Sequence, residues 1–163
     1  MVKNFLMKLH VIFTGKTTGK LFQEAIADYS DRLTHYLPFS IEELPDLKNA
    51  KNLSEDQQKE READMLFERL QPGDVLVLLD ERGREFTSRE FSLFLEQKIQ
   101  TVSKRLVFLI GGPYGFAPRV YEAAQSKISL SKMTFSHQMV RLFLVEQIYR
   151  ACTIMHGEPY HHD

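Results

Sequence analysis

Two uninterrupted apolar runs constrain the fold of this chain more than any other feature of its sequence. Residues 75–79 (VLVLL) and 106–110 (LVFLI) carry no polar side chain. Each run suits one strand and is far shorter than the ~20 residues of a membrane span, so no membrane span is expected. Such strands are buried on both faces, as in parallel sheets covered by helices. The runs therefore predict an α/β domain with a mostly parallel sheet.

Strand-like and helical segments alternate around these runs. Ser54 followed by Gln57 forms a capping box, which predicts the start of a helix. Apolar spacing and turn residues predict further strands over residues 9–13 and 39–44, and helices over residues 21–36, from residue 54, over 88–100 and over 137–156. Because ligands bind beyond the carboxyl ends of strands in such sheets, the loops after Leu79 and Ile110 are the first candidate sites.

Length, cysteine content and charge narrow the class of protein. The chain has 163 residues, a length typical of one domain. Its one cysteine, Cys152, cannot form an internal disulfide, which favours the reducing cytoplasm. The net charge is −1, but the last 63 residues carry seven Lys or Arg against four acids. This basic end permits an anionic partner such as RNA without requiring one.

Two glycine-containing segments follow predicted strands. Gly15-Lys16 is no phosphate loop, because that motif needs glycine five positions earlier, where His10 stands. Residues 111–116 (GGPYGF) follow an apolar strand directly, and glycine lets a ligand approach the backbone closely. A tight turn without a ligand explains the same residues, and only the position at the sheet edge favours a binding role.

Residues 128–135 (ISLSKMTF) begin as a strand and then lose their alternation. Such a stretch can surround an adenine, because apolar side chains form the slot and free backbone groups contact the base edge. The alternative is that Met133 and Phe135 belong to the ordinary core.

The helix predicted over residues 137–156 is apolar around most of its circumference. A helix of this kind packs on two sides, which in a small domain suggests an oligomer, and we expect a dimer. Arg141 lies beside the narrow polar arc of the helix, where it is either the partner of a surface salt bridge or a phosphate contact.

The last residues, Tyr160-His161-His162, are unusual for a chain end. Adjacent histidines point in different directions and no cysteine is near, so a zinc site is disfavoured. Stacking by Tyr160 and hydrogen bonding by His161 would suit contact with RNA. A frayed end is the alternative.

Four segments in order resemble the ribosomal large-subunit methyltransferase H family of the SPOUT class. They are MKLHVIFTGK from Met7, LLDERGREFTSREF from Leu78, LIGGPYGF from Leu109 and FSHQMVRLFLVEQIYRA from Phe135. The resemblance starts at Met7, so residues 1–6 are expected to be an N-terminal extension and residues 7–163 a single methyltransferase domain.

The resemblance implies an α/β knot fold with a C-terminal trefoil knot, and a homodimer. It also implies S-adenosylmethionine as the methyl donor, with no metal. Carried over residue by residue, the cofactor contacts fall on Leu79, Gly111, Leu130, Ser131, Lys132, Met133, Thr134 and Phe135.

The reaction that the resemblance implies is methyl transfer to N3 of a pseudouridine in the helix 69 stem-loop of 23S rRNA, on the assembled ribosome. Since N3 must lose a proton, a base or a hydrogen-bonding group is needed, and His161 is our candidate. Arg141, Arg150 and Tyr160 are candidates for holding the RNA. His162 stands where the family often has Arg or Lys, so no cationic phosphate contact is expected there. The alternative function is a non-catalytic RNA-binding or ribosome-associated module, which would not bind S-adenosylmethionine.

Overall fold

The computed structural model describes residues 7–162, so the expected extension over residues 1–6 lies outside the described residues. One parallel sheet has the strand order β2-β1-β4-β3-β5. Its strands are β1 (Lys8–Thr14), β2 (Phe39–Leu44), β3 (Val75–Glu85), β4 (Arg105–Ile110) and β5 (Ser126–Ser129). The predicted α/β class with a parallel sheet is confirmed, and the two apolar runs form the neighbouring strands β4 and β3.

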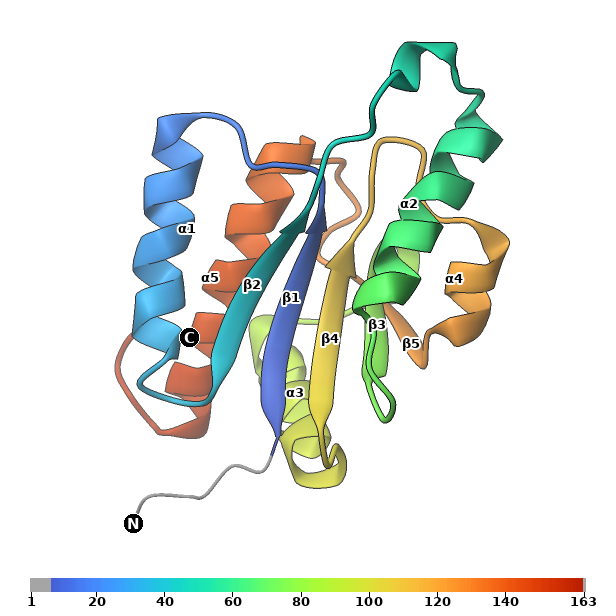
Figure 1. Cartoon of the computed structure of the whole chain (residues 1–163). Coiled ribbons are helices and arrows are strands. Elements are labelled where there is room, and N and C mark those ends of the chain that lie inside the picture. The colour runs from blue at the N-terminus through green and yellow to red at the C-terminus, as the bar shows by residue number, and fades with distance from the viewer. Residues whose placement is uncertain (1–6, 163) are drawn as a thin grey trace.

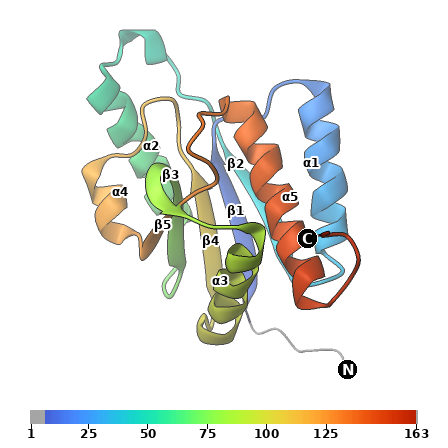
Figure 2. The same ribbon diagram turned by 180° about the vertical axis from the view of Figure 1, so that it is seen from behind.

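Helices cover the sheet on both faces (Figures 1 and 2). They are α1 (Lys20–Leu33), α2 (Glu55–Arg69), α3 (Ser88–Thr101), α4 (Pro118–Ala123) and α5 (His137–Met155), with a short 3-10 turn, η1 (Ala50–Asn52), before α2. On one face, α5 packs between α1 and α3, while α2 and α4 lie on the other face. Because strand side chains alternate, Val11 and Phe108 face the first layer and Ile12 and Leu109 the second.

The predicted capping box is present at α2. Ser54 Oγ accepts a hydrogen bond from the backbone N–H of Gln57, and the Gln57 side chain accepts one from the Ser54 N–H. Thr87 and Glu90 form the same arrangement at α3. These two reciprocal pairs fix where the helices begin.

Strand β3 continues beyond the predicted end at Leu79. The sequence predicts a loop directly after Leu79, but the strand resumes after an irregularity and pairs with β5 a second time. Ile128 is the register partner of both Leu79 and Arg84. A Cβ on Gly83 would lie 2.4 Å from the carbonyl carbon of Ile128, so only glycine lets the two backbones approach this closely.

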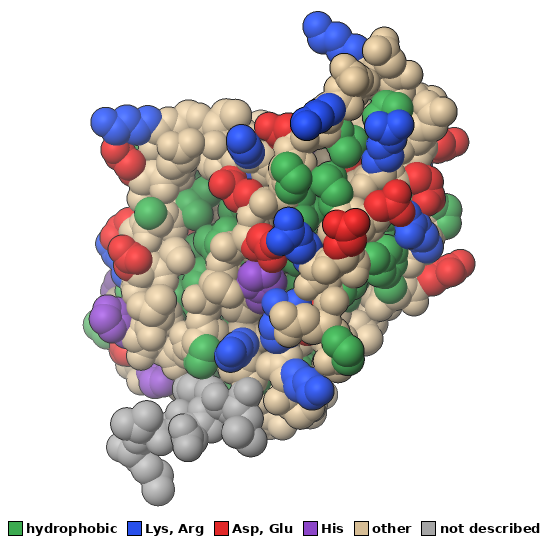
Figure 3. All heavy atoms as spheres, in the orientation of Figure 1, with side chains coloured by type: hydrophobic (Ala, Val, Ile, Leu, Met, Phe, Trp, Pro, Cys, Tyr) green, Lys and Arg blue, Asp and Glu red, His purple; other side chains and the backbone are tan. Residues whose placement is uncertain are grey.

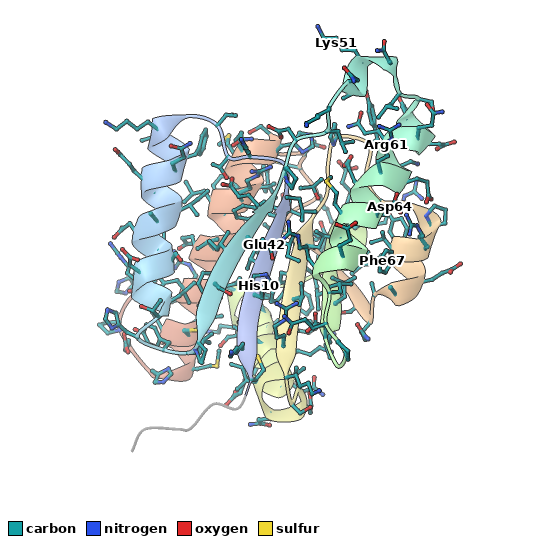
Figure 4. All side chains as sticks on the ribbon, in the orientation of Figure 1. His10, Glu42, Lys51, Arg61, Asp64 and Phe67 are labelled. Carbon is teal, nitrogen blue, oxygen red and sulfur yellow. The ribbon has the colours of Figure 1, made fainter. Side chains whose placement is uncertain are left out.

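The face of β1 and β2 on the α2 side is not covered by a helix in Figure 1. Polar side chains occupy it: His10 Nδ1 lies 2.6 Å from Ser40 Oγ, and His10 Nε2 lies 3.0 Å from Glu42 Oε1. Figure 4 labels His10 and Glu42 on this open face. The open face is therefore polar where it lacks a helix, as expected for a surface in contact with water.

Candidate methyl-donor cavity

A cavity of about 510 Å³ opens beyond the carboxyl ends of β3, β4 and β5. It is lined by residues from the loop after Leu79, the glycine loop (residues 111–116), the segment 128–135 and the start of α5. Of the eight predicted cofactor contacts, seven line it: Leu79, Gly111, Leu130, Ser131, Met133, Thr134 and Phe135. Lys132 does not line the cavity and is exposed.

Hydrogen bonds within the segment after β5 fix its conformation. Ser129 Oγ donates to the carbonyl oxygen of Ser131 at 2.9 Å, and Ser131 Oγ accepts from the backbone N–H of Met133 at 2.9 Å. Met133 is 77% exposed, which rules out the alternative that it belongs to the core. Phe135 is half-buried and packs edge-on against Phe143, with ring centroids 4.8 Å apart. The chain thus presents both apolar side chains and backbone groups to the cavity.

The side chains of Phe116 and Glu62 lie directly against the first two glycines of the glycine loop. A Cβ on Gly111 would lie 2.7 Å from the Phe116 ring, and one on Gly112 would lie 2.4 Å from Glu62 Oε2. Glu62, on α2, is buried, and its Oε2 has no hydrogen-bond partner among the described residues. Burial raises the pKa of Glu62, and the hydrogen bond from Gln58 only partly opposes this. Nothing in the sequence singles out Glu62, because it occupies a helix position like that of any surface acid.

A hydrogen bond joins two walls of the cavity. Tyr121 on α4 donates its hydroxyl to Asp80 Oδ2 at 2.5 Å, and Asp80 Oδ1 accepts from the backbone N–H of Arg82 at 2.8 Å. Burial and the bond to Asp80 raise the pKa of Tyr121 to about 12, so the hydroxyl remains a donor. Asp80 stands in the loop singled out from the sequence, whereas nothing in the sequence pointed to Tyr121.

Arg141 is buried, and its guanidinium holds the start of α5 against the end of β1. It donates to the carbonyl oxygens of Thr14 and Gly15 and to the Thr17 hydroxyl, each at 3.0 Å. Burial lowers the pKa of Arg141, although the charge of Glu43, 3.6 Å away, opposes this. With a side chain only 3% exposed, Arg141 offers its charge to neither solvent nor RNA. Of the two roles considered for it, a salt bridge is present, with Glu43, but on a buried guanidinium rather than an exposed one.

The carboxyl-terminal residues lie against α5 and α1, and none of them lines the cavity. Tyr160 donates to Glu146 Oε1 at 3.0 Å and packs edge-on against Tyr149. Arg150 pairs with Glu146 at 2.7 Å and lies 3.1 Å from His161 Nδ1. Because a guanidinium can only donate, Nδ1 of His161 is the acceptor and its proton is on Nε2. The structure thus brings Arg150, Tyr160 and His161 together, but apart from the cofactor candidates.

The apolar width of α5 has an explanation within one chain, since α1 and α3 flank it on both sides. Among residues 7–162, no helix is long and apolar enough to cross a bilayer. Within the same residues, no three His, Cys, Asp or Glu side chains gather as a metal site would require.

Comparison with known proteins decides the family. The model of the predicted SPOUT methyltransferase family matches residues 7–161. The ribosomal RNA large subunit methyltransferase H of Parabacteroides distasonis is 63% identical over 157 residues, which is 96% of this chain and 100% of that protein. The protein of the same name from Phocaeicola vulgatus is 58% identical over the same shares.

The chain belongs to the ribosomal RNA large subunit methyltransferase H family of SPOUT methyltransferases. The match covers every segment that lines the cavity as well as the carboxyl-terminal residues up to His161. The structure of a probable methylase family protein from Haemophilus influenzae superposes with a TM-score of 0.54 at 7% identity, over 95% of this chain and 69% of that one. At this identity the superposition shows a shared fold alone.

Proposed function

We propose that this protein transfers a methyl group from S-adenosylmethionine to N3 of a pseudouridine in the helix 69 stem-loop of 23S rRNA, on the assembled ribosome in the cytoplasm. The proposal rests on one observation. In a chain of this family, the residues after Leu79, the glycine loop and the segment 128–135 all line one cavity at the carboxyl ends of the strands. The relatives named above are ribosomal RNA methyltransferases, and their similarity extends over the whole cavity.

The cavity suits S-adenosylmethionine in size and chemistry. Its volume of about 510 Å³ lies within the range of small-molecule sites, roughly 300–1,000 Å³. Leu79, Ile110, Leu130 and Val140 provide apolar walls for an adenine, and the glycine loop brings its backbone to the cavity surface. When bound, S-adenosylmethionine supplies a methyl group on a sulfonium, which is already activated for transfer, so no metal is invoked. The protein's main task is to align donor and acceptor.

The N3 proton of the pseudouridine must leave as the new bond forms. With its Nδ1 accepting from Arg150, His161 is a hydrogen-bond donor through Nε2 rather than a base. An N–H group that donates to a carbonyl next to N3 stabilises the deprotonated imide and so eases loss of the proton. We therefore assign His161 a hydrogen-bonding role. Tyr160 and Arg150 would hold the RNA beside it, and Arg141 would position the start of α5.

Two further features belong to the proposal. We infer a homodimer and a trefoil knot, in which the chain after β5 passes through the loop formed by residues 80–85. Support for the knot comes from the double pairing of β5 with β3 on either side of residues 80–83. Support for the dimer comes from the family and from the exposed Met139 on α5.

The decisive experiment incubates the protein with labelled S-adenosylmethionine and ribosomes that lack the modification, followed by mass mapping of the rRNA nucleosides. A labelled methyl group on one helix 69 pseudouridine is expected. Calorimetry with S-adenosylmethionine alone distinguishes the methyltransferase from the alternative function. If saturating S-adenosylmethionine gives no heat of binding, the protein is a non-catalytic RNA-binding module instead.

A further inference from the structure

The four arginines among the last 63 residues are engaged within the chain, so they are not the cations most available to attract an RNA. Arg105 pairs with Asp74 at 2.7 Å, and Arg119 pairs with Glu60 and Asp64 at 2.9 and 2.5 Å. Arg141 is buried, and Arg150 is held by Glu146. Cations without an ion pair in the fold are therefore the better source of additional phosphate affinity.

Six other cations lie at the end of the sheet where the cavity opens, on loops, on η1, on α2 and in the irregular part of β3. All six are exposed and have no ion pair or side-chain hydrogen bond among residues 7–162: Lys16, Lys48, Lys51, Arg61, Arg82 and Lys132. Figure 3 shows Lys and Arg side chains along this rim, the upper edge in the orientation of Figure 1.

Most acids at the same edge are already engaged. Asp46 accepts from the backbone N–H of Lys16, Glu43 accepts from that of Thr17, and Asp80 accepts from Tyr121. Asp56 pairs with Lys59 at 3.3 Å, and Glu81 lies 3.4 Å from the Thr134 hydroxyl. Glu55 is in the first turn of α2, where the helix dipole stabilises its charge. These acids keep their negative charge but have partners within the fold, whereas the six cations have no ion pair among the described residues.

The connection between β2 and α2 carries two of the free cations to the outermost part of this rim. It rises beyond the strand ends in Figure 1, and Figure 4 shows Lys51 at its tip and Arg61 on the helix that follows. Asn49 adopts a left-handed conformation (φ 57°) and initiates the turn η1, which contains Lys51. Lys59, on the same helix, lines the cavity itself. The helix that follows the connection therefore reaches the cavity.

We propose that the β2–α2 connection, through Lys48 and Lys51, is an RNA-binding arm that contacts phosphates flanking the nucleotide in the cavity. The inference rests on the proposed function and adds to it the surface that holds the substrate. RNA phosphates fit because exposed, unpaired lysines release counterions when they contact them, and they need no base-specific geometry.

The test compares Lys48→Ala/Lys51→Ala with Lys8→Ala/Lys104→Ala. The control removes the same charge from exposed lysines at the opposite edge of the sheet, also without ion pairs among the described residues. Binding to ribosomes is measured between 50 and 300 mM KCl, and S-adenosylmethionine affinity reports on the integrity of the cavity. Counterion release at two phosphates predicts ribosome binding weaker by about 15- to 30-fold at 0.15 M salt, and a logarithmic salt dependence smaller by about 1.4 to 1.8. The control pair should change neither.

If both double variants lose the same ribosome affinity, the effect is one of net charge and the inference is overturned. Unchanged ribosome binding by Lys48→Ala/Lys51→Ala would overturn it as well. The affinity of Lys48→Ala/Lys51→Ala for a short RNA stem-loop of arbitrary sequence must fall in the same way as its affinity for the ribosome. Loss confined to ribosomes would point to a ribosomal protein and would also overturn it. Because these measurements need no methyl transfer, an inactive wild-type protein would refute the proposed function without deciding this inference.

Discussion

Replacing Gly112 with alanine tests how the glycine loop is held against α2. The new Cβ would lie 2.4 and 2.6 Å from the two Glu62 carboxyl oxygens. Ordinary van der Waals contact begins at 3.4 Å, so the carboxyl group or the loop must move by about 1 Å. Gly112 has no positive φ, and alanine therefore adds no backbone strain. Any loss of stability caused by Gly112→Ala is therefore steric.

The size of that penalty follows from the burial of Glu62. At 8% exposure, its carboxyl group has little room to move aside. Overpacking of a buried site costs about 1–3 kcal/mol, and we expect Gly112→Ala to lower the free energy of unfolding by about 2 kcal/mol. Binding of S-adenosylmethionine should weaken as well, because Gly112 lines the cavity.

A double-mutant cycle measured by urea unfolding isolates the contact. In the background of Glu62→Ala, Gly112→Ala should cost less than about 0.5 kcal/mol, because the obstructing carboxyl group is gone. In the background of Glu62→Gln, which keeps the size of the side chain, the full penalty should remain. An equal cost in all three backgrounds would refute the reasoning, since Glu62 would then not be what the added methyl group meets.

Three further changes test other contacts. Tyr121→Phe removes only the hydroxyl bonded to Asp80, and calorimetry should show S-adenosylmethionine binding about fivefold weaker, a loss of about 1 kcal/mol; an unchanged affinity would contradict this. Asp74→Asn breaks a buried pair with Arg105 and should lower the free energy of unfolding by about 3 kcal/mol at pH 7. Burial is the largest influence and acts to raise the pKa of Asp74, but the hydrogen bonds from Arg105 and from the Gln71 backbone, together with the charge of Arg105, outweigh it and hold the pKa below the ordinary 3.8. The wild-type advantage is therefore full above that value and disappears as the pH falls through the lowered pKa, which urea unfolding at pH 7 and pH 3 should show. His161→Ala should slow methyl transfer on ribosomes about 100-fold while leaving S-adenosylmethionine affinity unchanged; full turnover would remove its proposed role.

Local sequence patterns predicted most elements because each element has a local cause. The apolar runs of β3 and β4 allow nothing but buried strands, and the Ser54–Gln57 pair fixes the start of α2. The continuation of β3 to Glu85 has no local cause. It depends on a second pairing with Ile128, 44 positions beyond Arg84, which no apolar period within residues 80–85 encodes.

The cavity was predictable in outline because its motifs follow strands whose ends meet at one sheet edge. Individual partners were not. Arg141 sits beside a polar arc of its helix, yet its guanidinium is buried because the carbonyls of Thr14 and Gly15 face it from a strand more than 120 positions earlier. Tyr121 and Glu62 likewise gain their places from contacts across the fold. A sequence shows which side chains can form hydrogen bonds or ion pairs, but it does not show which distant residues are their partners.

The length of α5 determines how His161 can act. The cavity-lining segment leads into the start of α5 at His137, whereas His161 is bonded to Arg150, 13 residues further along the helix. Val140 is the last residue of α5 that lines the cavity, and it lies 10 residues before Arg150, about 15 Å at 1.5 Å per residue, so His161 lies well away from the cavity of its own chain. The role proposed for His161 therefore requires that it serve the cavity of a second copy. If the homodimer forms, its functional importance would then lie in bringing the carboxyl-terminal residues of one protomer to the cavity of its partner.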